Sequence, residues 1–129
     1  MTLQFPGGVA LTVRGDLRSV WTALEQFFLR RGWSVHERGP GRIDVERGSR
    51  RRSVFLGAFA GAKFHLSAPI ELREGPGVTE IRYLWGESAG RALGGASGRA
   101  RAARVHLETA GALEQQFGSD GRLVEARRL

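Results

Sequence analysis

The clearest pattern in the chain is an apolar stripe with helical spacing near the N-terminus. After a candidate strand over residues 9–14, Asp16 is a favourable helix N-cap, and Gly32 suits the position just past a final helical turn. Apolar side chains recur between them at intervals of three and four positions, at Leu17, Val20, Trp21, Leu24, Phe27 and Phe28. This spacing predicts an amphipathic helix between residues 17 and 31.

Apolar and polar residues alternate in several later segments, as is typical of half-buried strands. The predicted strands cover residues 33–38, 42–47, 54–59, 63–73 and 78–85. The segment 63–73 shows the cleanest alternation in the chain. Within it, Pro69 suits a sheet edge or a bulge, because proline has no backbone N–H to donate. The segment 54–59 is apolar on both faces, which fits burial in a core and also fits burial by a second copy of the chain in a homodimer.

A second, long helix is predicted to run to about Phe117, after a glycine-rich stretch over residues 86–98. Its expected apolar stripe is mostly alanine and consists of Ala96, Ala100, Ala103, Leu107, Ala110, Leu113 and Phe117. Such a smooth face lets a helix lie close against a sheet. Residues 118–129 are expected to form a turn followed by a short basic tail.

The predicted order of elements is therefore strand, helix, five strands and long helix. Most of the strands have one apolar and one polar face, which favours an α+β fold with a single antiparallel sheet of about six strands and both helices on one face. At 129 residues the chain fits one domain, 1–129, with its core over about 9–117 and the tail over 118–129.

The charge of the chain points to a class of partner. It has 20 Lys and Arg residues against 13 Asp and Glu, a formal net charge of +7, and Lys63 is its only lysine. A basic protein attracts polyanions such as nucleic acid. The preference for arginine over lysine, together with 19 glycines, is also what a GC-rich genome produces, so the net charge bears on function more than the choice of arginine does.

Several kinds of chemistry have no support in the sequence. The chain has no cysteine, which excludes disulfides, thiolate metal sites and a cysteine nucleophile. His36, His65 and His106 lack the spacing of metal ligands and are expected at the surface, so we predict no metal and no cofactor. There is no recognisable acid/base pair and no nucleophile elbow, so we predict no catalytic residues and expect a binding module rather than an enzyme.

The sequence also indicates a compartment. Residues 1–8 have neither the basic nor the apolar region of a signal peptide, and no apolar run approaches the ~20 residues of a membrane span. We therefore expect a soluble, cytoplasmic protein without a membrane span.

The order of elements resembles a reduced helix-grip domain of the START/polyketide-cyclase (SRPBCC) superfamily. The resemblance is carried by residues 16–24, 77–83 and the closing helix to Phe117, and it covers about residues 9–117. It implies a single curved antiparallel sheet that wraps the long helix, often around an apolar cavity. The order is also similar to the TATA-binding-protein-like fold, whose DNA-binding members use exposed aromatic residues on the free face of the sheet, whereas here that face is expected to be polar.

Two functional hypotheses follow from different features. The first is binding of a small apolar ligand between the sheet and the C-terminal helix, because small-molecule sites are usually apolar and lined by aromatic residues. Its expected lining is Trp33, Phe55, Phe59, Phe64, Tyr83, Trp85 and Leu107. The alternative is binding of nucleic acid or another polyanion, because guanidinium groups match phosphate oxygens well. Its expected contacts are Arg50, Arg51, Arg52, Arg99, Arg101 and Arg104.

Overall fold

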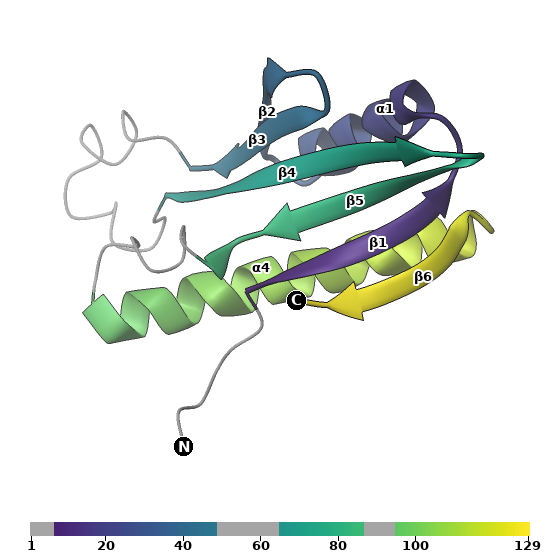
Figure 1. Cartoon of the computed structure of the whole chain (residues 1–129). Helices are drawn as coiled ribbons and strands as arrows, with labels where there is room; N and C mark the ends of the chain where they lie inside the picture. The colour runs from purple at the N-terminus through teal and green to yellow at the C-terminus, as the bar shows by residue number, and fades with distance from the viewer. Residues whose placement is uncertain (1–6, 49–64, 87–94) are drawn as a thin grey trace.

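A computed structural model describes residues 7–48, 65–86 and 95–129 of the chain (Figure 1). For residues 95–99 only the helical backbone is described. The elements of this part, in chain order, are β1 (Gly8–Arg14), α1 (Leu17–Arg30), β2 (Ser34–Gly39), β3 (Arg42–Arg47), β4 (Leu66–Gly75), β5 (Val78–Leu84), α4 (Gly95–Ser119) and β6 (Leu123–Arg128).

The strands form one antiparallel sheet of six strands in the order β2-β3-β4-β5-β1-β6. Both helices lie behind the same face of this sheet, with α1 behind its upper strands and α4 behind its lower ones (Figure 1). The contacts agree with this view, since α1 contacts β2, β4 and β5, and α4 contacts β1 and β6. The predicted α+β fold with two helices on one face is therefore confirmed.

Helix α1 begins and ends where the sequence predicts. The Asp16 carboxylate accepts a hydrogen bond from the Ser19 backbone N–H at 2.8 Å, and the Glu74 carboxylate from β4 accepts one from the Leu17 N–H at 2.6 Å. These bonds satisfy N–H groups that have no partner inside the helix. After the last turn, Gly32 has φ +85°, a left-handed conformation that glycine adopts without strain.

Pro69 limits how far β4 pairs with β5. The Leu72 N–H donates to the Gly41 carbonyl on the β3 side at 2.7 Å, and backbone N–H groups alternate sides along a strand. Position 69 therefore faces β5, where a proline has no N–H to donate. The ladder with β5 indeed begins at Ile70, whereas the ladder with β3 continues back to Leu66. Over residues 66–69, β4 is thus locally an edge, which is a position that the sequence predicts for Pro69.

The C-terminal residues form a strand, whereas the sequence predicts only a turn and a basic tail here. Strand β6 pairs with β1, and flanking bonds from Leu129 N–H to Gly8 O at 2.9 Å and from Arg14 N–H to Arg122 O at 2.8 Å extend this pairing. Only Leu123 and Arg122 are even half-buried here, so no alternation of apolar and polar residues announces the strand. In the described order a strand thus follows the long helix, and the predicted strand over 54–59 lies outside the described residues.

The buried stripe of α4 is rotated by about one residue from the predicted one. Among the described side chains of α4 the buried ones are Ala102, His106, Thr109, Ala110, Leu113 and Phe117, whereas Ala103 and Leu107 are half-buried and Ala100 is exposed. The polar members are accommodated by hydrogen bonds, as in the bond from Thr109 Oγ1 to Val105 O at 2.7 Å. In the part of the chain that the structure describes, neither helix combines the length and apolarity needed to cross a membrane.

Candidate functional site

A hollow of about 600 Å³ lies where β4 and β5 stop pairing. We call this end of the sheet, formed by residues 66–69 of β4 and 84–86 at the end of β5, the splayed end. Its described lining consists of Gly7, Arg38, Asp44, Glu46, His65, Ser67, Ala68, Pro69, Leu84 and Gly86. The volume is in the range of roughly 300–1,000 Å³ that small-molecule sites occupy. The missing N–H of Pro69 is the local reason that the ladder between β4 and β5 ends here.

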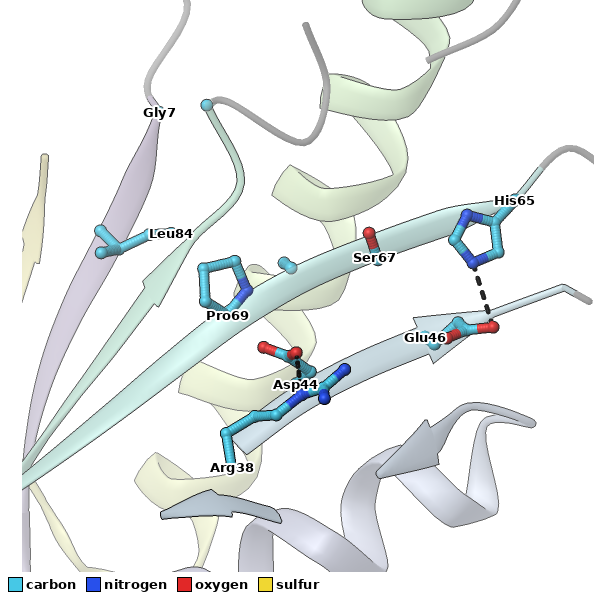
Figure 2. A pocket seen from close by; sticks show the side chains of 10 residues that line it. Gly7, Arg38, Asp44, Glu46, His65, Ser67, Pro69 and Leu84 are labelled. Carbon is cyan, nitrogen blue, oxygen red and sulfur yellow. Dashed lines mark hydrogen bonds and ion pairs between the residues drawn. The ribbon is translucent and has the colours of Figure 1, made fainter. Parts of the chain in front are cut away.

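One wall of this hollow carries polar side chains that pair with one another (Figure 2). Arg38 Nε lies 2.6 Å from Asp44 Oδ2, and His65 Nε2 lies 3.0 Å from Glu46 Oε1. The exposed fractions of the four side chains range from 30% to 65%, so solvent screens both pairs and they contribute little to stability. They fix polar groups along one side, while Gly7 and the apolar part of β4 leave the other side uncharged.

The paired wall does not form a metal centre with its neighbours. Among the residues at 7–48, 65–86 and 95–129, no three His, Asp or Glu side chains are grouped so that they could hold a metal ion. A zinc site needs at least three such protein ligands. The polar groups of this wall can donate and accept hydrogen bonds.

On the helix side of the same end, aromatic side chains form a closed cluster. Tyr83 of β5 contacts Trp85 with ring centroids 5.0 Å apart, and Phe28 of α1 lies edge-on to both Tyr83 and Trp33 at 5.7 and 5.4 Å. The ring of His106 from α4 stacks on Trp85 with an interplanar angle of 8°. Each of these side chains is at most 3% exposed. Three separate elements, β5, α1 and α4, thus meet at this cluster.

A buried polar pair lies inside the cluster. The Tyr83 hydroxyl oxygen lies 2.6 Å from His106 Nδ1. Burial lowers the pKa of His106 from 6.5 to about 4 and raises the pKa of Tyr83 above its ordinary value. Both groups are therefore neutral at physiological pH, and the Tyr83 O–H can donate to Nδ1 when the imidazole proton is on Nε2.

Trp85 supplies a hydrogen-bond donor that has no acceptor among the described residues. Its Nε1 is closed off from solvent, its side chain is 1% exposed, and no group in residues 7–48, 65–86 or 95–129 accepts a hydrogen bond from it. Leaving a buried donor unpaired costs about 1–3 kcal/mol, so each case calls for a physical explanation. Arg82 Nε also lacks a hydrogen bond, but the Glu80 carboxylate lies 3.9 Å away and balances its charge. The indole of Trp85 has no such compensation among the described residues.

The structure brings together part of the predicted ligand site. Trp33, Tyr83 and Trp85 meet in the aromatic cluster. Leu107 is half-buried on α4 and lines a different, smaller hollow of about 180 Å³ between α4 and the strands β1 and β6. The other predicted residues, Phe55, Phe59 and Phe64, lie outside the described residues.

The predicted arginine surface is described only in part. Arg101 and Arg104 are exposed on α4. The side chain of Arg99 is not among those described, and Arg50, Arg51 and Arg52 lie outside the described residues. Whether the six arginines share one face of the molecule therefore stays a prediction.

Sequence reasoning missed His106, which was expected at the surface but is 1% exposed. A signal was present, because His106 lies four residues after Ala102 and seven before Leu113, on the helical stripe that is buried. The predicted stripe instead contains Ala103 and Leu107, because these residues are apolar and histidine is polar. The partner that allows His106 to be buried is Tyr83, which lies 23 residues earlier in the chain, so a local pattern does not show the pair.

No protein-family model, no curated protein and no solved structure matches this chain. Its function is therefore inferred from the chemistry of its own residues.

Proposed function

We propose that this protein binds a small, mainly apolar ligand that carries one hydrogen-bond acceptor, at the splayed end between the sheet and α4. The observation that carries the proposal is the unpaired indole N–H of Trp85. A carbonyl, ether or hydroxyl oxygen of a ligand is the partner that this donor lacks. Such a ligand would also contact the aromatic faces of the cluster, which favour apolar and ring-containing molecules.

The surroundings of Trp85 suit a neutral ligand. Tyr83 and His106 are both neutral and already bonded to one another, so the interior offers no charge to balance an ionic ligand. Burying an unpaired charge beside them would be far more costly than burying a neutral oxygen. The ligand class is therefore a neutral apolar molecule with an exposed oxygen acceptor.

The hollow lies on the face of the sheet away from the helices, and we infer that a ligand reaches Trp85 from it by passing between the unpaired ends of β4 and β5. The hollow is lined by Gly86, which follows Trp85 directly, and by Gly7, whose carbonyl accepts hydrogen bonds from the Trp85 and Gly86 N–H groups at 2.8 and 2.9 Å. Because the indole N–H itself is closed off from solvent, binding requires the side chains at this end to part by a small movement. The lining glycines leave the approach free of side chains on that side.

The proposal is tested by titrating the full chain with 6-propionyl-2-dimethylaminonaphthalene, a neutral fluorescent ketone with one good acceptor. We expect saturable binding with a blue shift in emission. Trp85→Phe keeps an aromatic ring but removes the N–H, and it should weaken binding about five- to tenfold, as the loss of one buried hydrogen bond predicts. Trp21→Phe is the matched control, because Trp21 is half-buried on α1 outside the aromatic cluster, and its affinity should stay unchanged.

A second variant tests the route. Ser67 lines the hollow from β4, and Ser67→Phe would fill part of it without touching the aromatic cluster. We expect this variant to bind the ketone more weakly or more slowly than the wild-type chain. Equal affinity in the wild-type, Trp85→Phe and Ser67→Phe proteins, or no saturable binding at all, would refute ligand binding at this site.

A further inference from the structure

A second concave surface lies between the two helices, away from the splayed end. This groove, of about 360 Å³, is lined by Ala23, Gln26, Phe27, Arg30, Arg31, Leu113, Gln116, Phe117 and Asp120. Its floor is apolar, because Phe27, Leu113 and Phe117 are each at most 9% exposed and Ala23 is half-buried beside them. An apolar floor between two helices is a common setting for a small-molecule site.

The lining of the groove includes two cations that pair with no carboxylate in the described part of the chain. They are Arg30 and Arg31, which are exposed at the end of α1. The Arg31 guanidinium lies 5.3 Å from the centroid of the Phe27 ring, which holds the cation over the apolar floor. Basic residues are also favourable at a helix C-terminus, and this interaction with the helix dipole does not use the guanidinium N–H donors.

The lining of the groove also contains one acidic residue. The carboxylate of Asp120 accepts long hydrogen bonds of 3.4 Å from the Gln116 amide. An anionic group would be repelled by Asp120 and attracted to the arginines.

We propose that this groove binds a small organic carboxylate, with its carboxylate on Arg30 and Arg31 and its apolar part along the floor. The guanidinium fork matches a carboxylate with two parallel hydrogen bonds. Ala23 lies seven residues before Arg30 on α1, so the floor extends roughly 10 Å at 1.5 Å per residue. A short aliphatic or aryl carboxylate of about that length is the class of ligand that fits. The site is independent of the neutral-ligand site at the splayed end.

The test compares three eight-carbon probes with the same tail and different head groups, by calorimetric titration of the full chain. Octanoate should bind saturably, octan-1-ol about tenfold more weakly, and octylamine more weakly still. Only octanoate carries the negative charge that can pair with the two guanidinium groups. The double variant Arg30→Gln/Arg31→Gln should lose about tenfold in affinity for octanoate.

The matched control removes two charges elsewhere. Arg18 and Arg104 are exposed and do not line the groove, so Arg18→Gln/Arg104→Gln should bind octanoate within about twofold of the wild-type chain. All four substitutions are at exposed positions, and circular dichroism should show both double variants folded. Equal losses in the two double variants, equal binding of octan-1-ol and octanoate, or no saturable binding of octanoate would overturn the proposal.

Discussion

At the scale of single residues, polar groups buried without charge distinguish the interior of this protein. His106 and Tyr83 bond to each other at 2.6 Å, and Thr109 bonds to the backbone of its own helix. These partners explain why a stripe that contains a histidine and a threonine is buried as deeply as its apolar members. Trp85 is the exception in the described cluster, since its N–H has no such partner.

The buried imidazole predicts a pH dependence of stability. Burial holds the pKa of His106 at about 4 in the folded chain, whereas the unfolded chain has an ordinary value of 6.5. Between these values the unfolded chain binds more protons, so the stability contributed by neutral His106 is complete above about pH 6.5 and is lost as pH falls toward 4. From about pH 7.5 to about pH 5 this single group should lower the free energy of unfolding by about 2 kcal/mol.

Urea denaturation at the two pH values measures this effect, with His106→Gln as the reference. Glutamine can still bond to the Tyr83 hydroxyl but does not titrate. The wild-type chain should lose more stability than His106→Gln on acidification, by about 2 kcal/mol. Identical pH dependence in the two proteins would show that His106 is not held neutral by burial.

At the scale of elements, the sequence predicts what side-chain patterning controls and misses what the backbone controls. Helix α1 is predictable, because the Asp16 cap, the apolar stripe and Gly32 all indicate the same segment. Strand β6 is not, because it is held mainly by backbone hydrogen bonds to β1, which residues of any type except proline can donate. Pro69 ends the pairing of β4 with β5 because its missing N–H would face β5. This effect cannot be predicted without the register of the strands.

The two apolar residues that begin β6 offer a direct test of its role. Leu123 is half-buried and packs on the core, whereas the adjacent Val124 is 51% exposed. Leu123→Ala should therefore lower the free energy of unfolding by about 1–2 kcal/mol, and Val124→Ala by less than about 0.5 kcal/mol. Urea denaturation of both variants checks this, and equal, small effects would mean that β6 does not contribute to the folded core.

At the scale of the whole molecule, the shape of the sheet and the net charge lead to different expectations. The helical layer and the splayed end provide concave surfaces of definite chemistry, whereas the net charge of +7 is a property of the chain as a whole. A net positive charge by itself attracts polyanions without sequence specificity. The helix-grip resemblance and binding of nucleic acid both stay predictions.

Fluorescence anisotropy with a labelled DNA duplex across a salt series distinguishes weak, non-specific attraction from specific nucleic-acid binding. We expect weak binding at low salt that disappears near about 0.15 M salt, with a small loss on Arg101→Gln/Arg104→Gln, whose side chains are exposed on α4. Tight binding that persists at that ionic strength and depends on these two arginines would instead make nucleic-acid binding the main function.

The most direct test of the neutral-ligand site is the indole N–H signal of Trp85 in a proton–nitrogen correlation spectrum. The chain has three tryptophans, and the Trp85 signal is assigned by its absence in Trp85→Phe. On addition of the fluorescent ketone, a hydrogen bond to its oxygen should move the Trp85 indole proton downfield, while 2-dimethylaminonaphthalene, which lacks the carbonyl, should not. A Trp85 signal that stays in place while the ketone saturates the protein would contradict the proposed site.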